Sequence, residues 1–294
     1  MKSGKAYSGM RPRLSFFDLF VYGGMFFSLF ICVVPFLYII TLSLSNVRDI
    51  LQNQVGLLPR SFNTAAYRTI LKYPNFFLAY GNTFFYTSCG TCIALIFTIL
   101  FGYPLSKSFL WGNKIFLKLV VFCMFFSGGL VPAYLLVSNL RIISTPFAIL
   151  LPFAVNPFNL IILISFFKRV PHEIEEAALI DGLGYYGILF RIILPLSTAA
   201  IATIGLYYAV FFWNDWFHAL IYLKSKQYPV MLFLRNIVAG TQMVGEGAGS
   251  AEAQSLGIAV KSAVIIVSTL PIITLYPLLQ RFFIAGLTVG SVKG

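Results

Sequence analysis

Long apolar runs constrain the fold of this chain more than any other feature of its sequence. Of its 294 residues, 59% are hydrophobic and only 10% are charged, whereas a soluble globular domain carries about 25% charged residues. Crossing a bilayer takes roughly 20 apolar residues, so the length allows six spans and no large soluble domain. We therefore expect an all-α membrane protein, in which each helix satisfies its own backbone polar groups.

Six runs have the length and apolarity of a membrane span. They are residues 16–44, 79–104, 119–139, 145–167, 198–222 and 259–280. Two long loops, 45–78 and 223–258, and a charged segment, 168–197, connect them. The sequence thus predicts one transmembrane domain over residues 1–294.

The distribution of lysine and arginine predicts the orientation of these spans. The N-terminal tail holds four basic residues and the 105–118 turn three, whereas the opposing 140–144 turn holds only Arg141. Since short basic segments stay inside, both termini and segment 168–197 are expected in the cytoplasm, and the two long loops outside. The net charge of +12 is spread over these flanks, which favours lipid headgroups over nucleic acid as the partner.

No metal or cofactor site is expected in this chain. Cys89 and Cys92 form a C-x-x-C pair inside an apolar run, without a βαβ context or a second pair of ligands. His172 and His218 are too few and too far apart to hold a metal. The cysteines are better explained as small side chains packed in a membrane helix.

The segment "EEAALIDGLGYYGILFRIILPLS", residues 175–197, is unusual because it concentrates acid. Four of the nine carboxylates of the chain fall within nine positions, those of Glu173, Glu175, Glu176 and Asp181. Acids favour the first turn of a helix, where unpaired N–H groups attract negative charge, and a glycine such as the one that follows Asp181 often ends one. The pattern predicts a short helix, a bend and a second short helix on the cytoplasmic surface. This shape would suit docking into a groove on another protein; the alternative is a solvated loop with a chance cluster of acids.

This segment resembles the EAA loop of the membrane permeases of bacterial ABC importers. That pattern is E-A-A, three residues, Gly, nine residues, Ile, one residue and Leu-Pro. It is matched here by Glu176, Ala177, Ala178, Gly182, Ile192, Leu194 and Pro195. The C-terminal "QRFFIAGLTVGSVKG" is similar to carbohydrate permeases related to the smaller maltose-system permease, and "AVNPFNLIIL" and "FFWNDWFHALIYL" resemble those of polysaccharide systems, including alginate importers.

The resemblance implies the fold of a type I ABC importer permease and a coupling role for this loop. The short helix Glu173–Asp181 would dock in a cytoplasmic ATPase subunit, Glu176 would pair with a basic group there, and Gly182 would permit the bend. The residues expected to couple to the ATPase are Glu173, Glu176, Ala177, Ala178, Asp181, Gly182, Ile192, Leu194 and Pro195.

The resemblance also implies the partners. The sequence contains no G-x-x-x-x-G-K-[ST] phosphate loop, so the chain is not expected to be an enzyme; two partner ATPase subunits would use ATP and Mg. A homologous second permease would complete a heterodimer in the bacterial cytoplasmic membrane. The external loop 223–258 would meet an extracytoplasmic solute-binding protein.

Polar residues inside spans are candidates for the substrate path, because burying them in lipid is costly. They are Asn82, Asn156, Asn159, Trp213, Asn214, Asp215 and Trp216. Asp215 lies roughly 26 Å along its helix from Thr198, near the outer end. Aromatic rings could stack on the faces of sugars, and the neighbouring amides and carboxylate could bond the sugar hydroxyls. The competing interpretation is interfacial anchoring for the tryptophans and helix-to-helix hydrogen bonding for Asn156 and Asn159.

The sequence therefore predicts a permease subunit of an ATP-driven importer of oligo- or polysaccharides. An acidic saccharide such as alginate would suit the excess of basic over acidic residues predicted on the outer side. An ABC importer of a non-sugar solute is the alternative. A secondary transporter or channel would need repeat symmetry or several buried ionisable groups, and a membrane-embedded enzyme would need an intramembrane catalytic cluster. Neither pattern occurs in the sequence.

Overall fold

The structure of the chain is a computed structural model that describes residues 16–72, 75–246 and 256–274. Its ordered elements are helices, and the one extended pairing in this part of the chain is an isolated bridge between Ser45 and Phe62. The all-α prediction is thus confirmed for the described residues. The predicted N-terminal tail, the end of the sixth predicted span and the C-terminal "QRFFIAGLTVGSVKG" lie outside them.

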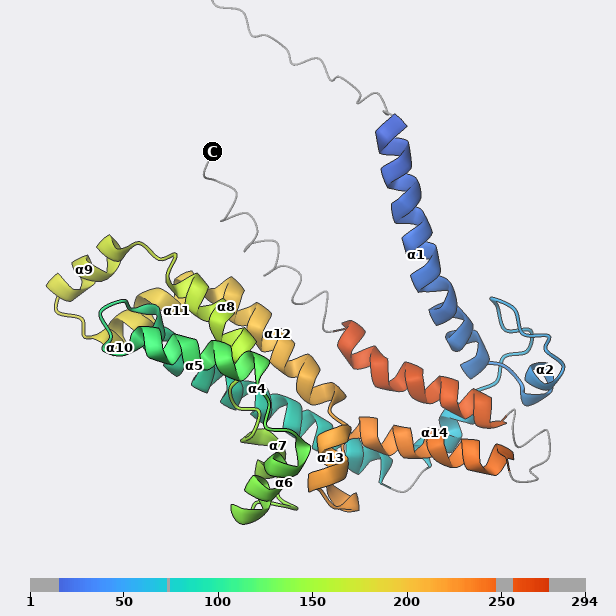
Figure 1. Cartoon of the computed structure of the whole chain (residues 1–294). Helices are drawn as coiled ribbons and strands as arrows, with labels where there is room; N and C mark the ends of the chain where they lie inside the picture. Colours follow the sequence, from blue (N-terminus) through green and yellow to red (C-terminus); the bar gives the residue numbers. More distant parts are fainter. Residues whose placement is uncertain (1–15, 73–74, 247–255, 275–294) are drawn as a thin grey trace, which may run out of the picture.

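The helices follow one another along the chain with short connections (Figure 1). Their bounds are α1 Phe16–Ser43, α2 Val47–Leu51, α3 Ala65–Leu71, α4 Phe76–Ser106, α5 Asn113–Phe125, α6 Leu130–Asn139, α7 Phe147–Leu150, α8 Pro157–Phe167, α9 His172–Ile180, α10 Tyr185–Ile188, the π-helix η1 Leu189–Ile193, α11 Leu194–Leu196, α12 Thr198–Asn214, α13 Phe217–Tyr222, the 3-10 helix η2 Ser225–Gln227, α14 Val230–Glu246 and a last helix Leu256–Thr274. Both long predicted loops therefore contain helices, α2 and α3 in the first, η2 and α14 in the second.

Among the described residues, three helices are long and apolar enough to cross a membrane. They are Phe20–Ser43, Phe76–Ser106 and Leu256–Thr274. Two bent pairs pass the same criteria together, α5 with α6 at 115° and Tyr185–Leu196 with α12 at 82°, so the number rises to five if each pair is one span. The helix α8 is apolar but shorter.

Three of the predicted spans are interrupted by side chains or glycines that end a helix. In the span 119–139, α5 stops and α6 starts after Gly129, whose φ of +90° is a conformation that glycine adopts without penalty. In the span 145–167, the Asn156 side chain caps α8 and Pro157 occupies its first turn. In the span 198–222, α12 ends at Asn214 and the Asp215 carboxylate accepts a hydrogen bond from the His218 N–H at the start of α13.

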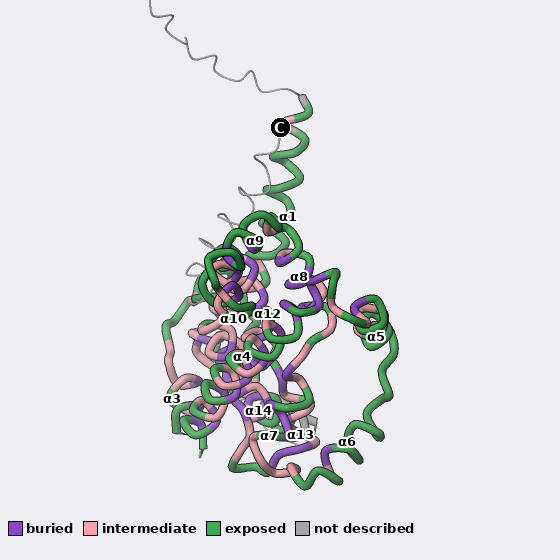
Figure 2. The backbone as a smooth tube through the Cα atoms, turned by 90° about the vertical axis from the view of Figure 1, so that its left-hand side faces the viewer, coloured by how far each residue is buried: buried purple, intermediate pink, exposed green. Residues whose placement is uncertain are grey.

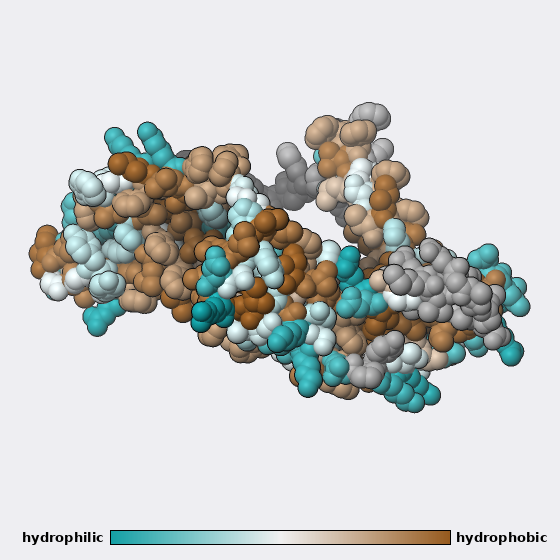
Figure 3. Space-filling view, turned by 60° about the horizontal axis from the view of Figure 1, so that its bottom comes forward, coloured by the Kyte–Doolittle hydropathy of each residue, from teal (hydrophilic) through white to brown (hydrophobic). Residues whose placement is uncertain are grey.

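Helix α1 projects away from the rest of the molecule and is exposed along most of its length (Figures 1 and 2). Most of its aromatic rings are exposed among the described residues; Phe20, for example, is 76% exposed. Apolar side chains also cover much of the remaining surface (Figure 3). An exposed apolar surface of this extent requires lipid or a second protein.

Helix α4 is the centre of the packed core. It packs against α12, with Gly90 beside Phe212, against α8, with Gly102 beside Leu163, and against α14 near its start. Buried residues from these helices and from the segment after α9 form one cluster, which includes Ala94, Leu163, Ile188, Ile204 and Phe212. A second cluster joins α3, α14 and the last helix through Ile70, Val230 and Ala263, among others. The end that carries α9 and the end that carries α14 are thus joined through α4.

Candidate functional site

The acidic segment folds as a short helix at one extremity of the molecule (Figure 1). Helix α9 begins after Pro171, as predicted from the sequence, and its C-cap is Asp181. Gly182 follows with a φ of +83°, a left-handed conformation in which a side chain would be strained. The chain then continues through α10, η1 and α11 into α12.

The outward face of α9 combines acid with apolar surface. The Glu173, Glu176 and Asp181 side chains are exposed, and so is Ala177. Next to them Ile180 is 86% exposed. Ile174 and Leu179 are exposed as well, and adjoining exposed apolar side chains mark an interaction surface rather than a solvated helix face.

The inward face of α9 consists of Glu175 and Ala178, which are the buried residues of this helix. Ala178 belongs to the main core cluster. Glu175 forms a buried ion pair with Lys107, which lies at the C-terminal end of α4. Sequence reasoning missed this pair. No local pattern pointed from Glu175 to a partner 68 residues away.

Two later residues of the matched loop motif, Ile192 and Leu194, lie against the core. Ile192 and Leu194 are half-buried and pack on the main cluster, with the fully buried Ile193 between them. Pro195 is exposed, in the short helix α11. The predicted coupling residues therefore differ in exposure. The acidic side chains on α9 are exposed, whereas Ile192 and Leu194, which follow later in the chain, are packed against the core.

The Asn82 and Asn156 side chains, both substrate-path candidates, make structural hydrogen bonds. The Asn82 amide of α4 donates to the backbone oxygens of Lys226 and Tyr228, at 3.0 and 3.2 Å. The Asn156 side chain accepts from the N–H groups of Phe158 and Asn159 at the start of α8. Asn159 itself is buried. That these residues line a substrate path stays a prediction.

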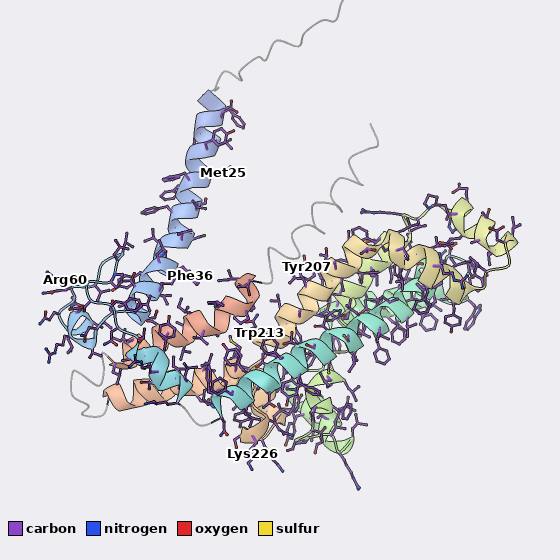
Figure 4. All side chains as sticks on the ribbon, turned by 180° about the vertical axis from the view of Figure 1, so that it is seen from behind. Met25, Phe36, Arg60, Tyr207, Trp213 and Lys226 are labelled. Carbon is purple, nitrogen blue, oxygen red and sulfur yellow. The ribbon has the colours of Figure 1, made fainter. Side chains whose placement is uncertain are left out.

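The aromatic candidates lie around the break between α12 and α13. Trp213 is buried where α12, α4 and the last helix meet (Figure 4), and its Nε1 donates to the Ser268 oxygen at 3.1 Å. Asn214 donates to the Val210 oxygen of its own helix. The Trp216 ring lies under the exposed Arg235 guanidinium, 3.9 Å from ring centroid to Cζ, a cation–π geometry.

The two carboxylate oxygens of Asp215 differ in their hydrogen bonding. Its Oδ1 accepts from the N–H and from Nδ1 of His218, at 3.2 and 2.8 Å, while its buried Oδ2 has no hydrogen-bond partner among the described residues. His218 in turn lines a cavity of about 500 Å³ together with Phe153 of the α7–α8 connection and Tyr222 of α13. Within the described residues, no group of three or more His, Cys, Asp or Glu side chains is placed to hold a metal ion.

The Tyr208 hydroxyl joins three helices, so removing it is expected to lower the stability of the protein measurably. Its buried hydroxyl bonds the Thr98 Oγ1 of α4 at 2.8 Å and accepts from the Asn156 N–H at 2.9 Å. Tyr208→Phe would leave both groups without a partner, which is expected to lower the free energy of unfolding by about 1–3 kcal/mol. Thermal unfolding in detergent measures this change. Tyr207→Phe, at the exposed neighbouring position, is the control; equal stability of the two variants would contradict the assigned role.

Comparisons with known proteins fit this arrangement. A family model described as "Binding-protein-dependent transport system inner membrane component" matches residues 78–289. The chain is 42% identical over 268 residues to Protein LplC of Bacillus subtilis (strain 168), covering 90% of each chain. It is 40% identical over 291 residues to the polygalacturonan/rhamnogalacturonan transport system permease protein YtcP of the same organism, covering 97% of this chain and 100% of YtcP.

A solved structure has a similar fold. It is the crystal structure of a bacterial ABC transporter involved in the import of the acidic polysaccharide alginate. One of its chains superimposes with a TM-score of 0.81 at 29% identity, covering 94% of this chain and 99% of that one.

Proposed function

The chain belongs to the family of binding-protein-dependent transport system inner membrane components, and we propose that it is a permease subunit of an ABC importer for uronate-containing oligo- or polysaccharides. Its all-helical architecture is that of an ABC importer permease. As a member of this family, it is an integral protein of the inner membrane.

The exposed position of α9 and the burial of its inner face are the observations that support the proposal. A short acidic helix lies at an extremity of the molecule, with Glu173 and Glu176 exposed and Glu175 anchored inside. Such a helix can bind an outside partner with one face and pull on the membrane helices with the other. We assign the outside partner as a cytoplasmic ATPase subunit that binds ATP and Mg, while this chain binds neither.

The proposed assembly has three kinds of partner. Each of two ATPase subunits would bind the exposed face of α9 in one permease or of the equivalent helix in the other. A homologous second permease would cover part of the apolar surface that α1 exposes. An extracytoplasmic solute-binding protein would contact the 223–258 region, of which η2 and most of α14 are described. The name of the family supports this last partner.

Two observations support an acidic saccharide. YtcP is named for polygalacturonan and rhamnogalacturonan transport, and the transporter of similar fold is named for the import of alginate; all three polymers contain uronic acids. In this chain, the 224–235 segment presents Lys224, Lys226 and Arg235 as exposed cations. The Arg235 guanidinium lies over the Trp216 ring and is exposed, and a guanidinium can bind a carboxylate through two parallel N–H groups.

Reconstitution with saccharides of different charge tests the proposal. The chain would be placed in nanodiscs with its partner permease, ATPase subunits and binding protein, and ATP hydrolysis would be measured with oligogalacturonate, oligoalginate or uncharged maltooligosaccharides. We expect a uronate oligomer to stimulate hydrolysis at a concentration at least about tenfold lower than a neutral oligomer, the difference that one charge-assisted contact produces.

The outcomes of this reconstitution separate the alternatives. Equal stimulation by neutral and acidic oligomers would contradict the preference for uronates. Stimulation by none of the saccharides, together with stimulation by another class of solute, would assign the importer to a non-sugar substrate. Uptake that runs without ATP hydrolysis would contradict the importer assignment itself.

A further inference from the structure

We propose that the buried Lys107–Glu175 ion pair is the joint through which α9 moves α4, and that α4 carries this movement to the 226–230 segment at its other end. This inference rests on the proposed coupling function of α9. It assigns Lys107 and Glu175 as positioning residues that touch neither ATP nor the transported solute. It also assigns Asn82, Thr83 and Tyr86 to the far end of the same rigid element.

The ion pair is enclosed. The side chains of Lys107 and Glu175 are 5% and 9% exposed, and the Lys107 ammonium donates to both Glu175 carboxylate oxygens. It also lies over the Tyr103 ring, 4.7 Å from the centroid. Glu175 and Ala178 are the buried side chains of α9, and of the two Glu175 makes the contact with a defined direction.

The backbone N–H and oxygen of Lys107 are both hydrogen-bonded. Its N–H donates to the Pro104 oxygen, and its oxygen accepts from the Asn113 amide at 2.9 Å, which also bonds the Leu105 oxygen at 2.8 Å. Asn113 thus satisfies carbonyls that the C-terminus of α4 would otherwise leave unpaired. A force applied to Glu175 therefore reaches the α4 backbone through a side chain with little freedom to yield.

Helix α4 can transmit such a force over a long distance. Its 31 residues, Phe76–Ser106, correspond to roughly 46 Å at 1.5 Å per residue. Gly102 lets the Leu160, Leu163 and Phe167 side chains of α8 approach its backbone, and the buried Ala94 and Thr98 lie further along. Pro104 lies in the last turn of α4, close to Lys107, so the part of the helix that precedes it is free of proline kinks. We expect this part, packed against α8 and α12, to move as one body.

The far end of α4 is fastened to the segment between η2 and α14. The Asn82 amide bonds the Lys226 and Tyr228 oxygens, the Tyr86 hydroxyl donates to the Gln227 oxygen at 3.0 Å, and the Thr83 hydroxyl accepts from the Val230 N–H at 2.7 Å. These bonds all involve main-chain atoms of 226–230. The segment must therefore follow α4 when α4 shifts. In Figure 4, Lys226 lies below the end of α4 that is remote from α9.

A buried ion pair adds little to the stability of a fold, but it can fix which two elements stay in contact. Replacing such a pair with apolar side chains of similar volume often leaves stability unchanged, whereas removing one partner leaves a buried charge uncompensated. The pair therefore specifies which two elements stay together during a movement. Apolar packing around Ala178 alone would allow α9 to slide over the core.

The test compares single and paired charge changes in the reconstituted importer, with ATP hydrolysis and uptake as readouts. Lys107→Ala and Glu175→Gln are expected to assemble with the ATPase subunits and to keep basal hydrolysis. Their saccharide-stimulated hydrolysis and uptake are expected to fall about tenfold or more, a coupling loss within the usual range. The exchange of Lys107→Glu with Glu175→Lys is expected to recover a large part of both. Lys114→Ala, which removes an exposed lysine from nearby α5, is the matched control.

Three outcomes decide the proposal. Single variants that are stimulated like the wild type would overturn the joint while leaving the proposed function intact. A wild-type complex that no saccharide stimulates would instead contradict the proposed function. Where a single variant fails to assemble, Glu175→Asp keeps the charge but shortens the side chain by one methylene: weaker stimulation with normal assembly supports the joint, and normal stimulation overturns it.

Discussion

Replacing Glu176 by lysine is expected to abolish transport without unfolding the chain. Glu176 is exposed on the outward face of α9, between Glu173 and Ile180, and contributes nothing to the core. Opposite a basic group of an ATPase subunit, the reversed charge would lose a favourable contact and add a repulsion. Disrupting such an interfacial pair costs about 2–5 kcal/mol, which lowers the affinity for the ATPase subunit at least about thirtyfold.

Co-purification of the ATPase subunits with the permease measures this effect, and saccharide-stimulated hydrolysis measures its consequence. Gly182→Pro provides a second variant of the same surface, since a φ of +83° is closed to proline. It should displace the turn after α9 and lower coupling as well. Lys118→Glu, a charge reversal at an exposed position of α5, is the control. Normal co-purification and stimulation of Glu176→Lys would remove α9 from the interface.

Gly90→Val is expected to cause the largest loss of folded protein. A Cβ at Gly90 would lie 2.7 Å from two atoms of the Phe212 ring and 2.8 Å from a third. Phe212 is fully buried in the main core cluster, so its ring has no space to move into. Overpacking a core usually costs about 1–3 kcal/mol, and we expect the upper end of this range because a β-branched side chain adds three carbons at the contact between α4 and α12.

Thermal unfolding in detergent, followed by size-exclusion chromatography, measures the loss. Gly81→Val is the matched control, because Gly81 is on the same helix and an added Cβ there meets nothing within 4 Å. Combining Gly90→Val with Phe212→Ala should recover part of the stability by making room for the new side chain. If Gly90→Val and Gly81→Val unfold alike, the close approach of α4 and α12 at this point is wrong.

Some features of this protein were accessible from local sequence alone. The apolar runs predicted helices of membrane-spanning length, because a bilayer imposes its thickness on any chain that crosses it. The acids after Pro171 and the glycine at 182 predicted the beginning and end of α9, because helix ends have local electrostatic and conformational requirements. The loop motif resembled ABC importer permeases, and family membership and fold agree with that resemblance.

The breaks inside the apolar runs were only partly predictable. Pro157 and Asn156 are visible in the sequence, yet membrane helices tolerate prolines when neighbours satisfy the freed groups. Whether a proline bends a helix or ends it depends on those neighbours. For Asn156 they include Tyr208, which is 52 residues away and bonds its N–H.

By itself, the sequence determined that this is an all-helical membrane chain with an acidic helix between two apolar segments. Only the tertiary structure decided what each acid of that helix does: Glu176 faces outward, whereas Glu175 turns inward to Lys107. The two are adjacent and identical in chemistry, so no local rule separates them. The distinction arises because α9 packs against the end of α4, and a buried carboxylate is stable only where a distant part of the chain supplies the opposite charge.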